Sequence, residues 1–170
     1  ASLAGVQVFA TGGLGGVHRG AEDTFDISAD LTELAKTPVS VISAGVKSIL
    51  DIPKTLEYLE TMGVPVTSYG TDYFPDFFTS SSGIKTEFRC DTPEECASMI
   101  FAQRAIGLKT GMIFANPVPK DKEADPVKVK AAIEEAHQEC IERGITGAKI
   151  TPFMLKKINE VTDGNSSAAN

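Results

Sequence analysis

Three groups of residues within the first fifty positions have types and spacings suited to chemistry on a small anionic substrate. A glycine-rich turn over residues 11–20 contains the pair His18 and Arg19. An acidic run over residues 26–30 follows it, and Lys47 completes the series. Backbone N–H groups of a glycine-rich turn can approach an anion closely, and His or Arg side chains add donors for phosphate oxygens. A tight structural turn explains the glycines equally well.

The glycines form neither of the common nucleotide-binding motifs. A Walker A loop requires Gly-Lys-[Ser/Thr] with a further glycine upstream, whereas Val46 separates Gly45 from Lys47. A dinucleotide fingerprint requires Gly-x-Gly-x-x-Gly, and counting from Gly13 places His18 where the third glycine should be. The sequence therefore disfavours both a P-loop and a Rossmann cofactor site.

The two turns that hold Thr11 and Lys47 follow predicted strands. Hydrophobic patterning predicts strands over residues 6–10, 39–44, 64–69 and 111–115. The first reads as a buried strand, and the third is expected near a sheet edge because Pro65 cannot donate to a ladder. Residues just past the carboxyl ends of strands line the ligand crevice of an open α/β sheet. We therefore expect both turns to face one pocket.

Helix signals alternate with these strands. A short helix is expected over residues 27–35 with Asp26 or Ser28 near its N-terminus, so plain helix capping is an alternative explanation of the acidic run. Other helices are expected from Asp51 to Met62, from the capping box Thr92-Pro93-Glu94-Glu95 to Ile106, from Asp125-Pro126 to Gly144, and from Thr151-Pro152 onward. Strands alternating with amphipathic helices predict a three-layer α/β/α fold with a largely parallel sheet.

The loop over residues 72–83 is rich in aromatic and serine residues. Its phenylalanines Phe74, Phe77 and Phe78 could form a lid over the pocket. A loop packed by its own aromatic side chains is the commoner case, and we expect that arrangement.

Composition limits the classes of partner. Of the 170 residues, 42% are hydrophobic and 23% are charged, which suffices for one α/β domain over residues 1–170 with a buried core. The formal net charge of -7 disfavours nucleic acid as a partner, because proteins that bind the phosphate backbone present a basic face. A phosphorylated partner is therefore expected to be a small molecule met by a local group of donors.

The sequence has no sign of a membrane or secreted protein. No apolar run approaches the roughly 20 residues of a membrane span, and no basic segment with an apolar stretch opens the chain. The cysteines Cys90, Cys96 and Cys140 are odd in number and lack metal-binding spacing, as expected of free thiols in a reducing compartment. We expect a soluble cytoplasmic protein in which Cys140 occupies a helix core position.

Three long motifs occur in a fixed order along the chain. They read Thr-Gly-Gly-Leu-Gly-Gly-Val-His-Arg-Gly at 11–20, Asp-Ile-Ser-Ala-Asp-Leu at 26–31, and Ala-Gly-Val-Lys-Ser-Ile-Leu-Asp-Ile at 44–52. With residues 55–61, Asn116-Pro117 and Thr151-Pro152-Phe153, they resemble pseudouridine-5′-phosphate glycosidase, the family also called indigoidine synthase A-like. Family members are considerably longer. The resemblance implies that residues 1–170 are a portion of a longer glycosidase domain, without the family's N-terminal part and C-terminal end.

The resemblance implies reversible cleavage of the C–C glycosidic bond of pseudouridine 5′-phosphate to uracil and ribose 5-phosphate. It also implies a manganese-dependent homotrimer, a hydrolase by class with lyase-like chemistry in nucleotide catabolism. A carbon leaving group does not depart as the base of an N-glycoside does, so a covalent route through the opened sugar helps. An amine adds to the anomeric carbon and forms an iminium electron sink.

Two residues match the reactive groups of that family. Lys47 matches the lysine nucleophile that forms the Schiff base, and its amine must be neutral to attack. Without the resemblance, a lysine at a strand end is more often a solvated charge or a phosphate contact. Asp26 matches the metal-binding aspartate. A hard cation held by one or two carboxylates and several waters leaves little sequence signature, so the motif alone carries this assignment.

The remaining matches concern substrate binding. Ser28, Ala29 and Asp30 match the family's substrate-binding segment, in which a hydroxyl and backbone N–H groups suit phosphate or sugar oxygens. Asp30 could accept from a sugar hydroxyl or handle protons. His18 is expected to face the substrate. Asn170 matches a base-contacting asparagine, since an amide can pair with the donor and acceptor edge of uracil.

The family's glutamate proton donor has no counterpart among these motifs. It belongs to the N-terminal part, together with a lysine and further residues that contact substrate, and no glutamate of this chain lies in a matching motif. An alternative is therefore a non-catalytic fragment, subunit or sugar-phosphate-binding module of the same family. Finding the N-terminal half in the parent reading frame would separate the two hypotheses.

Overall fold

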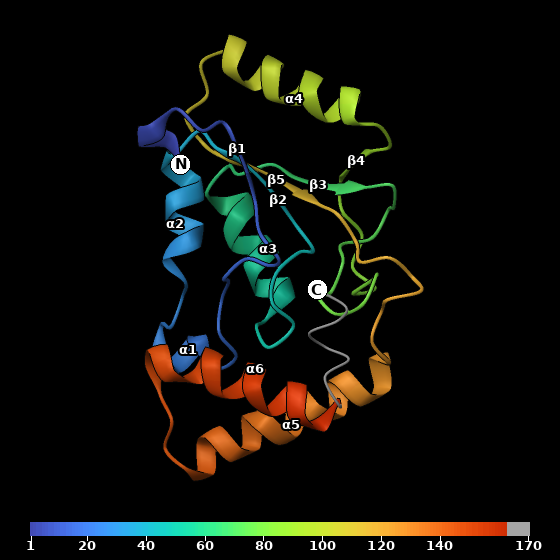
Figure 1. Cartoon of the computed structure of the whole chain (residues 1–170). Helices are drawn as coiled ribbons and strands as arrows, with labels where there is room; N and C mark the ends of the chain where they lie inside the picture. Colours follow the sequence, from blue (N-terminus) through green and yellow to red (C-terminus); the bar gives the residue numbers. More distant parts are fainter. Residues whose placement is uncertain (163–170) are drawn as a thin grey trace.

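The computed structural model describes residues 1–162 and has a parallel sheet at its centre. The five strands lie in the order β1-β2-β5-β3-β4, and every neighbouring pair is parallel (Figure 1). Their bounds are β1 (Val8–Ala10), β2 (Ser40–Ser43), β3 (Val66–Tyr69), β4 (Phe88–Cys90) and β5 (Met112–Ala115). The predicted α/β fold with a parallel sheet is confirmed.

The helices follow the strands in the order expected for this class. They are α1 (Ala21–Thr24), α2 (Ala29–Lys36), α3 (Ile52–Thr61), α4 (Pro93–Ala105), α5 (Pro126–Glu142) and α6 (Ile150–Val161), with short 3-10 turns at Ser2–Ala4 and Gly147–Lys149. Within the described part of the chain, none of them combines the length and apolar character needed to cross a membrane.

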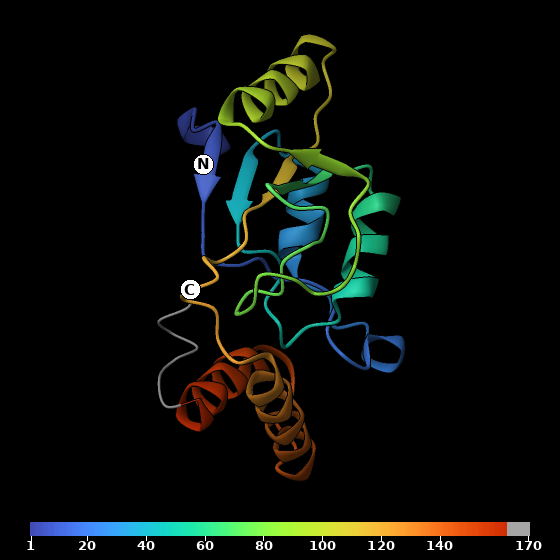
Figure 2. The ribbon, with the colours of Figure 1, turned by 90° about the vertical axis from the view of Figure 1, so that its right-hand side faces the viewer.

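Strand β5 divides the core into two layers. Ile113 and Ala115 face the larger hydrophobic cluster, which includes residues of α2 and α3. Met112 and Phe114 face a smaller cluster on the other side of the sheet, to which α4 contributes Met99. Figure 2 shows α4 and the α2–α3 pair on opposite sides of the strands. These are the three layers predicted from the sequence.

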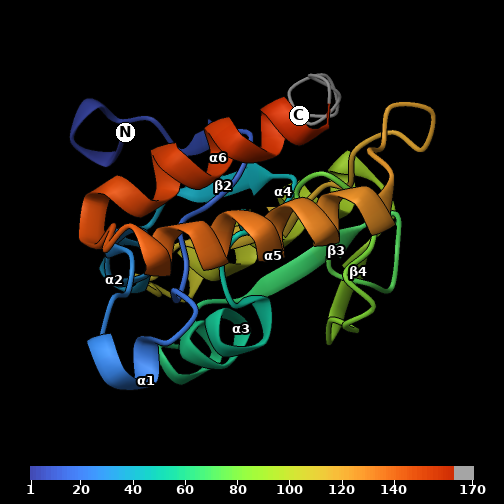
Figure 3. The same ribbon diagram turned by 90° about the horizontal axis from the view of Figure 1, so that it is seen from below.

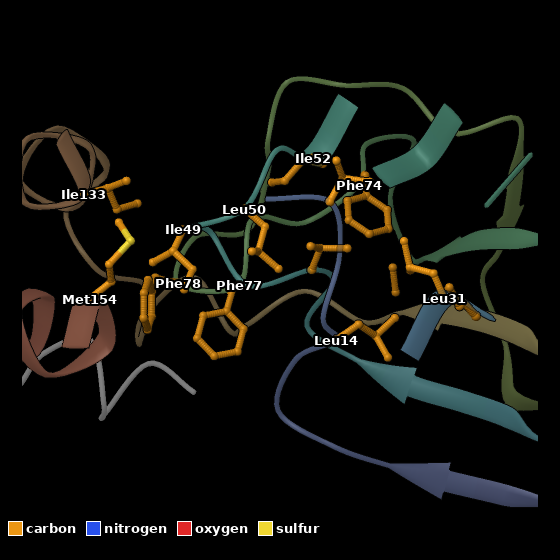
Figure 4. Close-up of a cluster of buried hydrophobic side chains, with 14 of the residues drawn as sticks. Leu14, Leu31, Ile49, Leu50, Ile52, Phe74, Phe77, Phe78, Ile133 and Met154 are labelled. Carbon is orange, nitrogen blue, oxygen red and sulfur yellow. The ribbon is translucent and has the colours of Figure 1, made fainter. Parts of the chain in front are cut away.

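Helices α5 and α6 lie across the carboxyl ends of the strands rather than on a sheet face. The arrows of β1 and β2 point toward them in Figure 2, and Figure 3 shows the two helices side by side from below. Ile133 of α5 and Met154 of α6 are buried next to Phe78 and Ile49 (Figure 4). The larger cluster therefore continues from the sheet face past the strand ends to this helix pair.

The helices begin where their capping residues stand. Ser28 Oγ accepts the Asp30 N–H at the start of α2, and Asp51 accepts the Lys54 N–H at the start of α3. Thr92 forms a full capping box with Glu95 at the start of α4. Each cap satisfies a backbone donor that would otherwise lack a partner, and a cap of this kind contributes about 1 kcal/mol.

The predictions for β1 and β3 also concerned their surroundings, and the one for β1 was wrong. β1 was expected to be buried, but Val8 and Phe9 are 45% and 47% exposed because β1 is the outermost strand. β3 was expected near an edge, and it lies next to the edge strand β4, between β4 and β5. Pro65 precedes its first residue, and the Pro65 carbonyl accepts the Ile113 N–H, so the missing donor costs nothing.

The aromatic loop between β3 and β4 is packed and does not form a lid. Phe74, Phe77 and Phe78 are all buried in the larger cluster. Phe77 adopts a left-handed backbone conformation with φ of 50°. Its ring lies where a Cβ on Gly13 would stand, 2.3 Å away. The aromatic loop thus packs closely against the glycine-rich turn at Gly13.

Candidate functional site

An extended segment over residues 14–18 joins the three groups of candidate residues. On one side it contacts the turn after β2. The Leu14 N–H donates to the Gly45 carbonyl at 2.9 Å, and the Lys47 N–H donates to the Leu14 carbonyl at 3.1 Å. The turn that carries Lys47 is therefore held by the glycine-rich turn after β1, through pairs that are 31 and 33 residues apart in the chain.

On its other side the same segment contacts the acidic run. The His18 N–H donates to the Asp26 carbonyl, and the Ser28 N–H donates to the Gly16 carbonyl, both at 3.0 Å. Because the two stretches run antiparallel, His18 comes to lie beside Asp26. All three motifs thus meet at the carboxyl end of the sheet, as the strand-end rule predicts.

Gly15 is required for the close approach of the acidic run. A Cβ at this position would stand 2.1 Å from Ser28 Oγ and 2.8 Å from Asp30 Oδ2. The Gly15 N–H donates to Asp30 Oδ2 at 2.7 Å. This N–H is consequently occupied by the protein and is unavailable to a bound anion, which favours the structural explanation for this glycine.

A cavity of about 490 Å³ contains Lys47 and Asp30 together. Thr11 and Gly13, which follow β1, line it next to Lys47, which follows β2. The prediction that two strand ends face one pocket is confirmed. The rest of the lining is mainly apolar and comes from β1, β2 and α2, with Phe9, Leu14, Leu34, Val39 and Val41.

Lys47 differs from its neighbour Lys54 in its surroundings. Lys54 Nζ lies 2.8 Å from Glu22 and 3.1 Å from Asp51, and hydrogen bonds to these carboxylates raise its pKa. Lys47 is half-buried, and within residues 1–162 no carboxylate lies within ion-pair distance of its amine. A lysine without a carboxylate partner is the better nucleophile, because an ion pair favours the charged, unreactive form.

His18 and Asp26 form a pair beside the cavity rather than in its lining. His18 Nδ1 lies 3.9 Å from Asp26 Oδ2, and the Asp26 side chain is 33% exposed. Among residues 1–162, no three His, Cys, Asp or Glu side chains gather closely enough to hold a metal. A hard divalent ion can take one carboxylate and complete its shell with water and ligand oxygens. The partly exposed Asp26 carboxylate fits such a water-rich site.

Arg19 is engaged by α5. Its guanidinium lies 2.8 Å from Glu134, so it ties the glycine-rich turn to the helix across the strand ends. Its role as a donor to phosphate would require breaking that ion pair. We therefore assign Arg19 a structural role and do not include it among the phosphate donors.

Two acidic groups near the site were not singled out from the sequence. Glu33 lines the cavity, but its hydrogen bond to Lys36 lowers its pKa and keeps it ionised. Asp76 has a raised pKa because it is desolvated, against the opposing effects of Ser48 and Arg19. Asp76 does not line the cavity of Lys47. Neither carboxyl group is therefore both protonated and in place to serve as an acid there.

Of the other predicted residues, Ser28 and Ala29 precede Asp30 at the start of α2 and do not line the cavity. Ser28 is half-buried as the cap of α2, and Ala29 is exposed at its first position. Asn170 lies outside the described residues. The place of Asp76 beside the turn after β2 had no signal in the sequence, because it depends on the pairing of Asp76 with Gly45.

Comparison with protein families gives one match over the whole chain. The family described as indigoidine synthase A like protein matches residues 1–170. A Rhizobium johnstonii protein named pseudouridine-5′-phosphate glycosidase 2 is 56% identical over all of this chain. Proteins named pseudouridine-5′-phosphate glycosidase from Caldanaerobacter subterraneus and Arabidopsis thaliana are 54% and 52% identical.

Two solved structures share the fold. The prealnumycin C-glycosynthase AlnA, in complex with ribulose 5-phosphate, superposes with a TM-score of 0.91 at 37% identity over 99% of this chain. An indigoidine synthase A-like protein from Thermotoga maritima superposes with a TM-score of 0.87 at 35% identity over 98% of this chain. This chain covers 57% and 54% of those two proteins.

The relatives are longer than this chain. The match takes in 55% of the Rhizobium and Caldanaerobacter proteins and 52% of the Arabidopsis protein. The chain thus spans about half the length of the curated relatives it matches. The motifs that meet around Lys47 lie within the shared half.

Proposed function

This chain belongs to the family of indigoidine synthase A-like proteins, and we propose that it is the lysine-bearing part of a pseudouridine-5′-phosphate glycosidase. The observation that carries the proposal is the placement of Lys47, without a carboxylate partner among residues 1–162, in one cavity with Asp30. Relatives that are 50% or more identical over the whole chain and carry this name support it. The substrate is pseudouridine 5′-phosphate, and the products are uracil and ribose 5-phosphate.

The chemistry requires an amine at the anomeric carbon. The neutral amine of Lys47 bonds to C1′ of the sugar as the C1′–O4′ bond breaks and the ring opens. O4′ takes up a proton, and the new C–N nitrogen loses one. The nitrogen lone pair then forms a C=N bond as the C–C bond to uracil breaks, and the released electron pair is protonated on the uracil ring. Water hydrolyses the iminium, which returns the free lysine and releases ribose 5-phosphate. An acid must assist the opening of the ring and the protonation of uracil.

The other cavity residues suit the sugar phosphate. Thr11 offers a hydroxyl and Asp30 a carboxylate oxygen to sugar hydroxyls, and both line the cavity with Lys47. Ala29 lies exposed at the N-terminus of α2, where backbone N–H groups attract an anion. The complex of AlnA with ribulose 5-phosphate supports a sugar-phosphate ligand in this fold.

A divalent ion, Mn²⁺ by the family resemblance, is proposed at Asp26. Bound there, it would neutralise negative charge on ligand oxygens. Replacing Asp26 by Ala should weaken Mn²⁺ binding by at least about tenfold, because the ion loses its protein carboxylate. The electron paramagnetic resonance signal of free Mn²⁺ measures this directly. Asp23→Ala, which removes an exposed carboxylate three residues earlier, is the control. Unchanged binding in Asp26→Ala would leave Asp26 as a helix-end residue.

The substrate class is tested with a completed chain. We define the completed chain as residues 1–170 extended by the segments that flank the matched region in the Rhizobium johnstonii relative. Incubated with pseudouridine 5′-phosphate it should release uracil, whereas uridine 5′-phosphate, which has an N-glycosidic bond, should be left intact. Equal release from both compounds would indicate an ordinary nucleotide hydrolase and would refute a route specific for the C–C bond.

A second candidate is a sugar-phosphate-binding subunit without turnover. The observation in its favour is that the chain spans only 55% of the relatives that carry the enzyme's name. Binding of ribose 5-phosphate without any uracil release by the completed chain would support this candidate. A homotrimer and a cytoplasmic location are part of the main proposal, and sedimentation of the completed chain tests the trimer.

A further inference from the structure

The smaller hydrophobic cluster, between the sheet and α4, is rich in sulfur. Cys90 ends β4, Met112 begins β5, and Cys96 and Met99 belong to α4. Cys96 and Met99 are three residues apart, so they lie on one face of the helix. Four sulfur-containing side chains from three elements thus meet in one cluster. Helix α2, which helps to line the cavity of Lys47, lies on the opposite side of the sheet (Figure 2).

Cys90 contacts two other sulfur atoms of this cluster. Its thiol donates a hydrogen bond to Met99 Sδ at 3.2 Å. The Cys96 thiol lies within hydrogen-bond reach of the Cys90 thiol, and burial together with this neighbour raises the pKa of Cys96 to about 11. Both cysteines are free thiols. Two thiols and one thioether are therefore in direct contact, which no spacing of cysteines alone in the sequence reveals.

These three groups are suitable ligands for a soft cation. Thiolate and thioether sulfur select Cu⁺ among the biological metals. Metal–sulfur bonds are about 2.3 Å long, so two sulfur atoms on one ion stand roughly 4 Å apart. The Cys90–Met99 contact has to widen only slightly to reach that separation, and the unbranched methionine side chain adapts easily. Zn²⁺ takes four ligands in structural sites, and among residues 1–162 no three His, Cys, Asp or Glu side chains gather to hold it.

The surroundings favour binding of a cation over direct reaction of the thiols. Burial raises the pKa of Cys90, and the charges of Glu95 and Asp91 act in the same direction. Oxidants react with the thiolate, so a thiol with a raised pKa reacts slowly with them. A bound cation removes this penalty, because its charge compensates the thiolate in the buried site. Cys90 is only 2% exposed, but Cys96 and Met99 are half-buried, so a small ion can reach the group past them.

We propose that Cys90, Cys96 and Met99 form a binding site for Cu⁺ between β4 and α4, separate from the cavity of Lys47. On binding, the ion forms bonds to both cysteine sulfur atoms and to Met99 Sδ. The two thiol protons pass to the solvent, and neither the ion nor the sulfur atoms change oxidation state. This site does not depend on the proposed glycosidase function.

A competition titration without oxygen tests the site. The 170-residue chain, verified as folded by far-UV circular dichroism, is titrated with Cu⁺ in the presence of the chromophoric chelator bicinchoninate. The chain should retain one Cu⁺ against the chelator. Cys96→Ser should weaken binding by at least about 100-fold, since even groups outside the ligand set typically account for 10–100-fold. Met99→Leu conserves volume and removes the weaker thioether ligand, so it should weaken binding by about tenfold.

Two variants in the larger hydrophobic cluster are matched controls. Cys140→Ser removes the third cysteine, and Met154→Leu repeats the methionine substitution at a buried position of α6. Both should retain Cu⁺ as the parent does. Complete loss of Cu⁺ from the parent to bicinchoninate would show only adventitious binding by thiols and would overturn the proposal. Unchanged retention by a folded Cys96→Ser variant, or loss of binding in Cys140→Ser, would overturn it as well.

Discussion

Replacing Lys47 by Ala should lower uracil release by the completed chain by about 10³-fold or more, since removal of a nucleophile takes away the covalent route altogether. The side chain is half-buried at the cavity wall and makes no ion pair within residues 1–162. Its loss should therefore cost little stability. Far-UV circular dichroism and thermal unfolding of the variant should match those of the parent protein.

Lys54→Ala is the matched control for this loss. Lys54 lies seven residues later, and its amine pairs with Glu22 and Asp51 on the surface. An exposed pair of this kind contributes little, so the variant should retain the uracil release of the parent. A loss in Lys54→Ala equal to that in Lys47→Ala would mean that general charge, rather than a positioned amine, supports the reaction.

Extending the chain to the length of its relatives should have the second largest effect. The 170-residue chain alone should release uracil about 10²–10⁴-fold more slowly than the completed chain, the range expected for loss of a positioned acid. The cavity offers Glu33 and Asp30, and Glu33 is kept ionised by Lys36. The rates of the two proteins at equal concentration give the ratio, with light scattering to exclude association through the open β1 edge.

A further comparison assigns this effect to the right group. Glu33→Gln in the 170-residue chain should leave its slow rate unchanged if Glu33 is not the acid. Rapid uracil release by the 170-residue chain that is lost in Glu33→Gln would show that Glu33 is the acid. Rapid release that survives Glu33→Gln would point instead to another carboxyl group of the chain.

The fold followed from local signals wherever a cap or a long apolar pattern stood in the sequence. Asp51 and the capping box of Thr92 and Glu95 mark helix starts because each satisfies a backbone donor within three residues. Strand β4 was not predicted, since three residues interrupted by Arg89 carry no periodic signal. Helix α1 was missed for a similar reason. It has four residues, and the residues that flank it, Gly20 and Phe25, both have a left-handed backbone conformation.

The sequence predicted those site residues that directly follow strands. The rule that turns after parallel strands converge placed Thr11 and Lys47 at one pocket. The partnership of His18 with Asp26 and of Gly15 with Asp30 arises from the antiparallel contact between residues 14–18 and 26–28, which no local pattern encodes. The exposure of β1 was beyond prediction as well, because Val8 and Phe9 look like interior residues and no local signal shows that their strand is the outermost one.

Trapping of the covalent intermediate tests directly whether Lys47 is the nucleophile. The completed chain is incubated with ribose 5-phosphate, reduced with borohydride and digested, and the modified lysine is identified by peptide mass mapping. An iminium on the reactive amine becomes a stable secondary amine under these conditions. We expect a reduced ribose 5-phosphate adduct on Lys47 that disappears in Lys47→Ala. An adduct found only on other lysines, such as Lys54, would contradict it.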